Sequence, residues 1–162
     1  MPRSFFSRIF SASKKEIRLR HILQLGCLME QQAETYYRRF AEQAQDTDVR
    51  ELCLKLANEE TQHYSLIDNI LSRWETLPMT EEHLEAMDAA GRLRRVFLSP
   101  PDSDATKKQI IEYAMNEEMR MVDFYRSFEK EFTNMWKEAK LWQMVGEEMG
   151  HVTKLRDMLS VT

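Results

Sequence analysis

Apolar residues recur every three to four positions along two long stretches of the chain that contain no proline, 3–77 and 102–162. This spacing is typical of helices that bury one face. In the first stretch it predicts a helix over 17–44 and a second over 48–75, separated by a turn and N-cap at 46–48. The expected buried positions are Leu25, Leu28, Met29, Tyr36, Phe40 and Ala44, followed by Leu52, Leu56, Leu66, Ile67, Ile70 and Leu71.

The second stretch has the same organisation. Its pattern predicts a helix over 104–132, with an N-cap signal at 103–104, and another over 134–160, after a turn at 133–134. The expected buried positions are Ile110, Ile111, Ala114, Val122, Phe124 and Phe128, followed by Trp142, Val145, Val152, Leu155, Met158 and Leu159.

A long segment, about 76–103, connects the two stretches and contains a short predicted helix from Thr80 to Phe97. A connection of this length can run along a bundle, so we expect each stretch to form an antiparallel hairpin. The expected fold is all-α: a four-helix bundle of two pseudo-two-fold-related hairpins with one long crossover, the connectivity of ferritin-like proteins. The bundle is expected over 17–162, preceded by a basic amphipathic segment at 1–16.

Composition agrees with long helices and excludes several other classes. The chain has only 4 glycines and 4 prolines in 162 residues, too few for a β-rich fold with many tight turns. A net charge of −4 and a pI of about 5.7 do not suit a protein whose main partner is nucleic acid. The two cysteines form no CxxC motif, which excludes a zinc ribbon built from this chain alone and favours a reducing cytoplasm. No apolar run reaches the ~20 residues that span a bilayer.

The polar residues of the two stretches also repeat. A shift of 88 residues aligns the stretches without a gap, and the matches are concentrated at polar positions that would be free to vary on a solvated surface. A period this long does not indicate a solenoid and favours two copies of one hairpin. The matching pairs are Glu30 and Glu118, Tyr37 and Tyr125, Arg38 and Arg126, Phe40 and Phe128, Glu59 and Glu147, Glu60 and Glu148, His63 and His151, and Leu71 and Leu159.

Each copy of the repeat carries potential metal ligands. The motif Glu-x-x-His occurs at 60–63 and at 148–151, and residues three apart share one helix face. Glu30 and Glu118 each precede a motif glutamate by 30 residues, a spacing that can bring both glutamates of a hairpin to similar heights. One glutamate from each of two helices, with Glu-x-x-His from each of the other two, is the ligand pattern of di-iron and di-manganese carboxylate bundles. The candidate ligands are therefore Glu30, Glu60, His63, Glu118, Glu148 and His151.

Charge and ligand type support this interpretation. Two divalent cations would neutralise four glutamates, whose burial as bare carboxylates would be very costly. Oxygen and imidazole ligands suit iron and manganese. The alternative is that these glutamates all lie on solvated helix surfaces, and the equal spacing of two complete sets argues against it. The remaining histidines, His21 and His83, have no glutamate three residues earlier and are expected at the surface or in the crossover.

Four short stretches resemble the rubrerythrin branch of the ferritin-like superfamily: EQQAETYY at 30–37, ANEETQH at 57–63, EMRMVDFY at 118–125 and GEEMGH at 146–151. The resemblance extends over about 20–160, nearly the whole chain.

The resemblance implies two iron ions held by the six candidate ligands, with manganese or a mixed pair as alternatives. It further implies that Glu60 and Glu148 bridge the metals and that Glu30 and Glu118 are terminal ligands.

Two departures from the rubrerythrin pattern affect the expected activity. Rubrerythrins carry an extra glutamate three residues after the third-helix ligand, and this chain has Met121 there. Glu34 lies four residues after Glu30 on another helix and does not replace it directly. The redox-linked iron movement of the family, and with it fast peroxide reduction, is therefore in doubt. The rubredoxin-like domain also has no counterpart in the sequence, which implies an external electron donor.

Tyr37 and Tyr125 each follow a candidate ligand by seven residues, two turns along the same helix face. Their hydroxyls could hydrogen-bond a ligating carboxylate or histidine, or donate a proton or an electron. They could equally be core aromatics whose hydroxyls are satisfied elsewhere.

Two metals about 3.5–4 Å apart can bind both ends of an O–O bond and deliver one electron each. With iron, this predicts an oxidoreductase that reduces hydrogen peroxide or dioxygen. The same ligands would also serve a ferroxidase that oxidises Fe(II) for storage or detoxification. Outside the enzymes, the alternative is a metal-free helical scaffold that acts through its N-terminal arm.

That arm, 1–15, places Phe5, Phe6, Ile9 and Phe10 on one helical face among basic residues. Such a segment could lie on an anionic membrane or contact a partner protein, or it could pack as a cap on the bundle or on a second subunit. We expect a homo-oligomer, in which the long crossover would also allow the hairpins to be exchanged between subunits.

Overall fold

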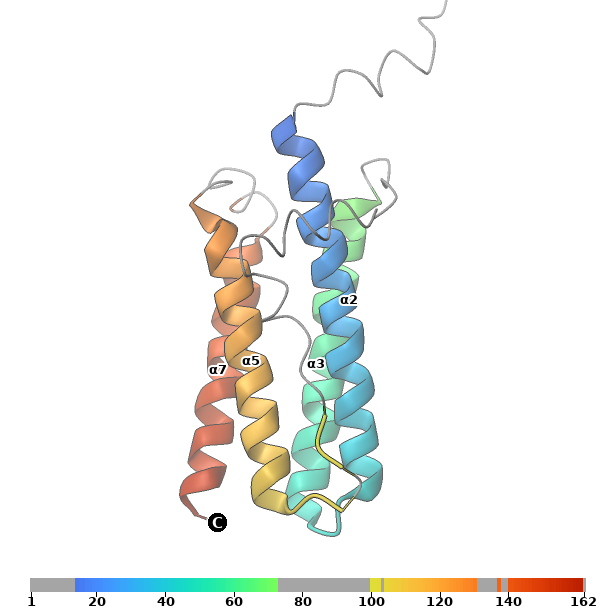
Figure 1. Cartoon of the computed structure of the whole chain (residues 1–162), viewed down its shortest axis with the longest axis vertical. Helices are drawn as coiled ribbons and strands as arrows, with labels where there is room; N and C mark the ends of the chain where they lie inside the picture. The colour runs from blue at the N-terminus through green and yellow to red at the C-terminus, as the bar shows by residue number, and fades with distance from the viewer. Residues whose placement is uncertain (1–13, 73–99, 103, 131–136, 138–139, 162) are drawn as a thin grey trace, which may run out of the picture.

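Four α-helices form the bundle in the computed structural model, which describes residues 14–72, 100–102, 104–130, 137 and 140–161 (Figure 1). This part of the chain contains no strand. The helices are α2 (Lys14–Gln43), α3 (Thr47–Leu71), α5 (Lys107–Glu129) and α7 (Leu141–Ser160).

The helices pair as two antiparallel hairpins. In Figure 1, α2 runs down and α3 returns upwards beside it, while α5 runs up and α7 returns downwards beside it. The closest helix contacts lie within the pairs α2–α3 and α5–α7, with fewer contacts between the pairs. Because α3 ends at one end of the bundle and α5 begins at the other, the connection between them joins opposite ends. The prediction of an all-α four-helix bundle with one crossover is confirmed.

Some predictions concern residues that the structure does not describe. The predicted short helix from Thr80 to Phe97, the turn at 133–134 and nearly all of the amphipathic arm at 1–16 lie outside the described residues. Those expectations therefore stay predictions.

Local hydrogen bonds explain where α3 and α5 begin. The side chain of Asp46 caps α3 by accepting from the backbone N–H of Val49 at 3.1 Å. Helix α5 begins three residues later than the sequence pattern suggested, because Thr106 and Gln109 form a capping box there. Lys107 then pairs with Asp46 at 2.8 Å, which links the start of α5 to the α2–α3 turn.

The last helix begins later than predicted. The sequence pattern placed its start near 134, whereas α7 begins at Leu141. Lys140, immediately before it, has φ 57° and ψ 22°. This left-handed conformation cannot continue a right-handed helix, so Lys140 sets the boundary. The periodic apolar pattern runs across this residue and does not reveal it.

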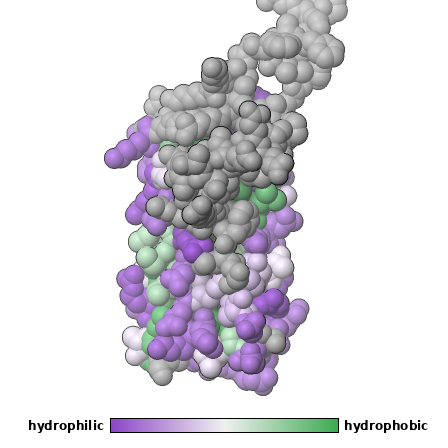
Figure 2. All heavy atoms as spheres, in the orientation of Figure 1, coloured by the Kyte–Doolittle hydropathy of each residue, from purple (hydrophilic) through white to green (hydrophobic). Residues whose placement is uncertain are grey.

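The core lies between the hairpins and follows the repeat. Tyr37, Phe40, Tyr125 and Phe128 are among its largest fully buried side chains, and they form two repeat-related pairs. The two cysteines, Cys27 and Cys53, are buried and free. Figure 2 shows a largely hydrophilic surface over the described helices, with smaller apolar areas between the charged side chains.

Three burial predictions were wrong. Leu28 and Trp142 were expected in the core but are 49% and 53% exposed. The equivalent positions of the other hairpin are exposed too: Leu28 corresponds to exposed Asn116, and Trp142 corresponds to Leu54, which is 42% exposed. His21 was expected at the surface or in the crossover but is buried, at 4% exposure. His83 lies outside the described residues.

Within the described ranges, no helix is both long enough and apolar enough to cross a membrane.

Candidate metal centre

The bundle brings all six predicted ligands together in its interior. Helix α2 supplies one glutamate and α5 another, while α3 and α7 each supply a glutamate and a histidine from one helix face. None of the six is more than 3% exposed. The residues are Glu30, Glu60, His63, Glu118, Glu148 and His151.

Their side chains form two overlapping groups, each able to surround one cation. The first group contains Glu30, Glu60, His63 and Glu148, and one donor atom from each lies within 4.8 Å of the others. The second group contains Glu60, Glu118, Glu148 and His151, and its donor atoms also lie within 4.8 Å of one another. Only Glu60 and Glu148 belong to both groups. A carboxylate that belongs to two adjacent cation sites is placed to bridge them.

Both imidazole rings turn Nδ1 towards the glutamates. His63 Nδ1 lies 2.9 Å from Glu148 and 3.6 Å from Glu30. His151 Nδ1 lies 3.1 Å from Glu118 and 3.2 Å from Glu148. The two rings stack with centroids 6.0 Å apart. Nδ1 is therefore the nitrogen that each histidine turns towards the two ligand groups.

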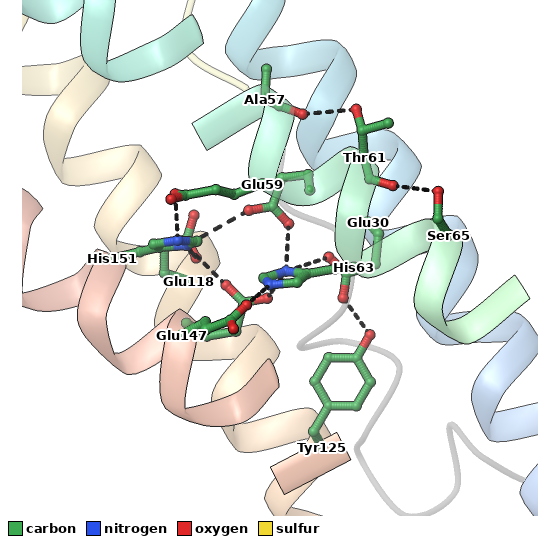
Figure 3. Close-up of polar contacts among 12 residues, drawn as sticks. Glu30, Ala57, Glu59, Thr61, His63, Ser65, Glu118, Tyr125, Glu147 and His151 are labelled. Atoms are coloured by element: carbon green, nitrogen blue, oxygen red, sulfur yellow. Dashed lines mark hydrogen bonds and ion pairs between the residues drawn. The ribbon is translucent and has the colours of Figure 1, made fainter. Parts of the chain in front are cut away.

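The outer nitrogens contact two further glutamates that the sequence analysis did not assign to the site. His63 Nε2 lies 2.9 Å from Glu147 of α7, and His151 Nε2 lies 2.7 Å from Glu59 of α3 (Figure 3). An Nε2–H that faces a carboxylate leaves the Nδ1 lone pair for a metal and fixes the ring orientation. The sequence signal for this role is the repeat itself, since Glu59 and Glu147 are a matching pair.

The two tyrosines contact Glu118 and Glu30, the glutamates that each belong to only one ligand group. Tyr37 donates a short hydrogen bond to Glu118, and Tyr125 donates one to Glu30. Figure 3 shows the Tyr125 hydroxyl directed at the Glu30 carboxylate. Burial raises the pKa of both phenols, and the adjacent glutamates raise it further. Both hydroxyls are therefore protonated donors at neutral pH.

All four of these outer contacts cross between the hairpins. The first hairpin, α2 and α3, supplies Tyr37 and Glu59 to ligands of the second, and the second supplies Tyr125 and Glu147 to ligands of the first. Each half of the cluster is therefore oriented by side chains of the other half.

Close packing of carboxylates perturbs their protonation. Burial raises the pKa of Glu60 and Glu148, and each raises that of the other by like-charge repulsion. Burial alone would also raise the pKa of Glu118, but the adjacent Glu148 carboxyl and hydrogen bonds from His151 and Tyr37 lower it overall. Without cations, the two shared glutamates therefore take up protons more readily than free carboxylates do.

The glutamates of the cluster also change the pKa values of the two histidines. Burial opposes their protonation, but contacts with Glu148, Glu30 and Glu60 raise the pKa of His63, and contacts with Glu118 raise that of His151. Both imidazoles therefore bind a proton more readily than a free histidine when no metal is bound. A metal would have to displace the Nδ1 proton of each.

The unpartnered atoms of the cluster fit bound cations. Both oxygens of Glu60, both oxygens of Glu148 and one oxygen of Glu30 are buried without a hydrogen-bond partner. His63 Nδ1 also lies at ion-pair distance from Glu148 without the alignment of a hydrogen bond. Buried polar atoms normally have partners, and leaving them without any is costly. Two divalent cations would satisfy all these atoms together.

The two extra candidates lie outside the cluster. Glu34 is 27% exposed and pairs with Arg38 at 2.8 Å. Met121 is buried in the apolar core, at 2% exposure. Neither is among the side chains that can surround a cation together.

One buried carboxylate was not anticipated. Glu117, next to Glu118, is only 9% exposed, and one of its oxygens has no hydrogen-bond partner. Burial raises its pKa to about 7. No sequence pattern pointed to it, because its repeat counterpart is Met29.

Comparison with known proteins agrees with the geometry. The family model described as Rubrerythrin matches residues 21–159, which covers all six cluster residues and both tyrosines. No curated protein and no solved structure matches the chain significantly.

Proposed function

This chain belongs to the rubrerythrin family, and on that premise we propose that it is a non-haem di-iron oxidoreductase that reduces hydrogen peroxide with electrons from an external donor. The observation that carries the proposal is the pair of overlapping ligand groups, which share two buried carboxylates whose oxygens have no hydrogen-bond partner. Structural ion pairing alone would not require these unpartnered oxygens.

We assign the six side chains as follows. Glu60 and Glu148 would be shared by the two metals, because each belongs to both groups. Glu30 with His63 holds one metal, and Glu118 with His151 holds the other. Glu59 and Glu147 accept the Nε2–H of the histidines, and the tyrosines donate to the terminal glutamates.

When bound, a pair of Fe(II) ions supplies two electrons to an O–O bond. Reduction of hydrogen peroxide then consumes two electrons and two protons and releases two waters. The chain itself provides groups that hold protons near the metal ligands. The Tyr37 and Tyr125 hydroxyls keep their protons at neutral pH and hold them within hydrogen-bond reach of Glu118 and Glu30. Burial of the cluster keeps bulk water away from the reacting atoms.

Met121 favours a second candidate, ferroxidase activity. It lies three residues after Glu118, where rubrerythrins carry an additional glutamate, and its thioether offers no carboxylate to a metal. A centre without that ligand is less suited to the redox-linked iron movement that accompanies rapid peroxide turnover. Oxidation of Fe(II) for storage uses the same six ligands without requiring that movement.

Stopped-flow oxidation of the anaerobically Fe(II)-loaded protein separates the two activities. Equal concentrations of hydrogen peroxide and dioxygen are mixed with the loaded protein, and ferric absorbance is followed. The proposal predicts that peroxide oxidises the centre much faster than dioxygen does. Equal rates would contradict the peroxidase assignment and support the ferroxidase. A Met121→Glu variant restores the missing carboxylate and is expected to increase the preference for peroxide.

A further inference from the structure

Gly26 lies in the interior of α2 at a point of very close approach. A β-carbon built on it would lie 2.9 Å from the Tyr125 hydroxyl oxygen, 3.3 Å from Cε1 of the same ring and 3.4 Å from Cδ1 of Ile67. Real β-carbons essentially never approach another heavy atom to less than 3.0 Å. Glycine lowers helix stability relative to alanine, so its presence here has a structural reason.

The Tyr125 ring has little freedom to move away from such a β-carbon. It is fully buried, at 0% exposure. Its hydroxyl donates to Glu30, one helical turn after Gly26 on the same helix, and its ring packs edge-to-face against Phe124 with centroids 5.3 Å apart. A side chain at position 26 would therefore displace the phenol from the glutamate.

We propose that Gly26 is a positioning residue for the candidate metal centre: it allows the Tyr125 hydroxyl to lie against α2 and fix the terminal carboxylate Glu30. The consequence for metal binding rests on the proposed function, whereas the packing relation does not. Gly26 acts through Tyr125 and touches neither the metals nor the substrate.

This arrangement is specific to one half of the centre. The repeat counterpart of Gly26 is Ala114, which is buried at 2% exposure. Tyr37 therefore reaches Glu118 although the position matching Gly26 in the second hairpin carries a methyl group. The two terminal glutamates thus receive equivalent hydrogen bonds from tyrosines that are seated differently. Substitution at 26 should disturb one metal position and spare the other.

The chain contains a matched control in Gly146, within α7. A β-carbon built there meets nothing within 4 Å. Gly146→Ala should therefore show only the favourable helix effect, raising the Tm by roughly 1–3 °C. Gly26→Ala carries the same chemical change, but the overpacking should lower the Tm by roughly 4–8 °C.

A double-mutant cycle on the metal-free full chain tests the packing relation. Tyr125→Phe removes the atom at 2.9 Å and leaves the ring carbon at 3.3 Å. We expect Tyr125→Phe to abolish most of the Tm loss caused by Gly26→Ala, and Tyr37→Phe to leave that loss unchanged. The same loss in all three backgrounds would overturn the inference. If Gly26→Ala does not fold, the Gly26→Ala/Tyr125→Phe protein should fold, and its failure to do so would also overturn the inference.

Titration with Co(II), followed by its visible absorption, tests the consequence for the metals. In Gly26→Ala one of two equivalents should bind roughly 10–100-fold more weakly, as expected when a partner of a ligand is lost. The other equivalent should bind with unchanged affinity. The Gly26→Ala/Tyr125→Phe protein should bind Co(II) no more weakly than Tyr125→Phe alone. Equal weakening of both equivalents would contradict the assignment to one half. If the unmodified chain binds no Co(II), the proposed function fails, while the metal-free cycle still decides the role of Gly26.

Discussion

The two hairpins supply the same chemistry to the cluster from different surroundings. Each contributes one terminal glutamate, one Glu-x-x-His motif, one tyrosine and one glutamate that faces a histidine. The side chains around these groups have diverged between the hairpins. Three repeat pairs that differ are Gly26 and Ala114, Met29 and Glu117, and Ala33 and Met121. The retained residues include every member of the two ligand groups and of the four outer contacts, and the changed ones can make the two halves of the cluster unequal.

The retained tyrosines and outer glutamates each contact a candidate ligand of the opposite hairpin. Tyr125 and Glu147 of the second hairpin contact ligands of the first, and Tyr37 and Glu59 of the first contact ligands of the second. Backbone contacts between hairpins are fewer than those within them. The polar cluster therefore joins the two halves alongside the apolar core that lies between them, and metal binding should stabilise the bundle as a whole.

Removing a ligand should have the largest effect and should separate shared from terminal residues. Glu60→Gln or Glu148→Gln removes an oxygen donor from both ligand groups, so each should lower the stoichiometry from two metals per chain to near zero. Glu30→Gln and Glu118→Gln each affect only one group and should leave about one metal per chain. Metal analysis after Fe(II) or Mn(II) loading measures this.

Glu34→Gln is the control for these variants, because Glu34 lies on α2 but outside the cluster and pairs with Arg38. It should retain two metals. Loss of both metals from the terminal variants as well would show that the two groups do not fill independently.

The pH dependence of stability tests the raised pKa values of the shared glutamates and of the two histidines. In the metal-free protein the raised pKa values of Glu60 and Glu148 mean that folding takes up protons. The raised pKa values of His63 and His151 contribute stability that is complete below about pH 6.5 and is lost as pH rises through the folded-state values. Urea unfolding should therefore show lower stability at pH 8 than at pH 6.

Bound metal should oppose this loss of stability with rising pH, because the cations replace the protons. The affinity of the cluster for metal also increases with pH. The stabilisation by Mn(II) should be larger at pH 8 than at pH 6. Replacing either histidine with Gln should weaken both trends, because both rings take part. A metal-free protein that becomes more stable between pH 6 and 8 would contradict the assigned protonation states.

The glutamates that face the histidines should have intermediate effects, unequal between the halves. Glu59 is 27% exposed, whereas Glu147 is 64% exposed, although both lie close to a histidine Nε2. Glu59→Gln should weaken metal binding at the His151 position by roughly 10–100-fold. Glu147→Gln should have a smaller effect, because solvent screens an exposed charge and can replace it as acceptor. Isothermal titration with Mn(II) compares the two, and equal losses would contradict the role assigned to burial.

Glu117 should give the smallest effect, confined to the second half. Its pKa is raised from 4.5 to about 7, so the folded protein holds a proton there that the unfolded chain has released. The free energy of unfolding should fall as pH rises from about 4.5 to 7. The slope of this fall should be at most that produced by the release of one proton. Glu117→Gln should remove that part of the fall in urea unfolding measured across this range. Glu112→Gln, at a half-exposed position on the same helix, is the matched control.

Much of the candidate site could be predicted from the sequence because the repeat marks it twice. A glutamate retained at 30 and 118, in positions where a solvated residue would vary, indicates a shared chemical role. The Glu-x-x-His motifs define helix faces, and the hairpin topology brings those faces together. The repeat also retains Glu59 and Glu147, so a shared role for them could have been predicted. Which histidine each one contacts depends on the packing of α3 against α7.

Other features depend on information that a periodic pattern does not hold. Lys140 fixes the start of α7 through a left-handed backbone conformation that its residue type does not encode. A single glycine within a helical pattern, such as Gly26, shows its purpose only when Tyr125 is placed against it. Leu28 and Trp142 lie at the edge of an apolar stripe, where spacing alone does not fix burial.

An anomalous-difference Fourier map of crystals loaded with Fe(II) or Mn(II) is the most direct test of the central assignment. We predict two peaks per chain between the four helices, about 3.5–4 Å apart, with Glu60 and Glu148 contacting both. One of the peaks should also contact Glu30 and His63, and the other Glu118 and His151. A single peak, peaks bound elsewhere on the chain, or two peaks without a shared carboxylate would contradict the dinuclear centre.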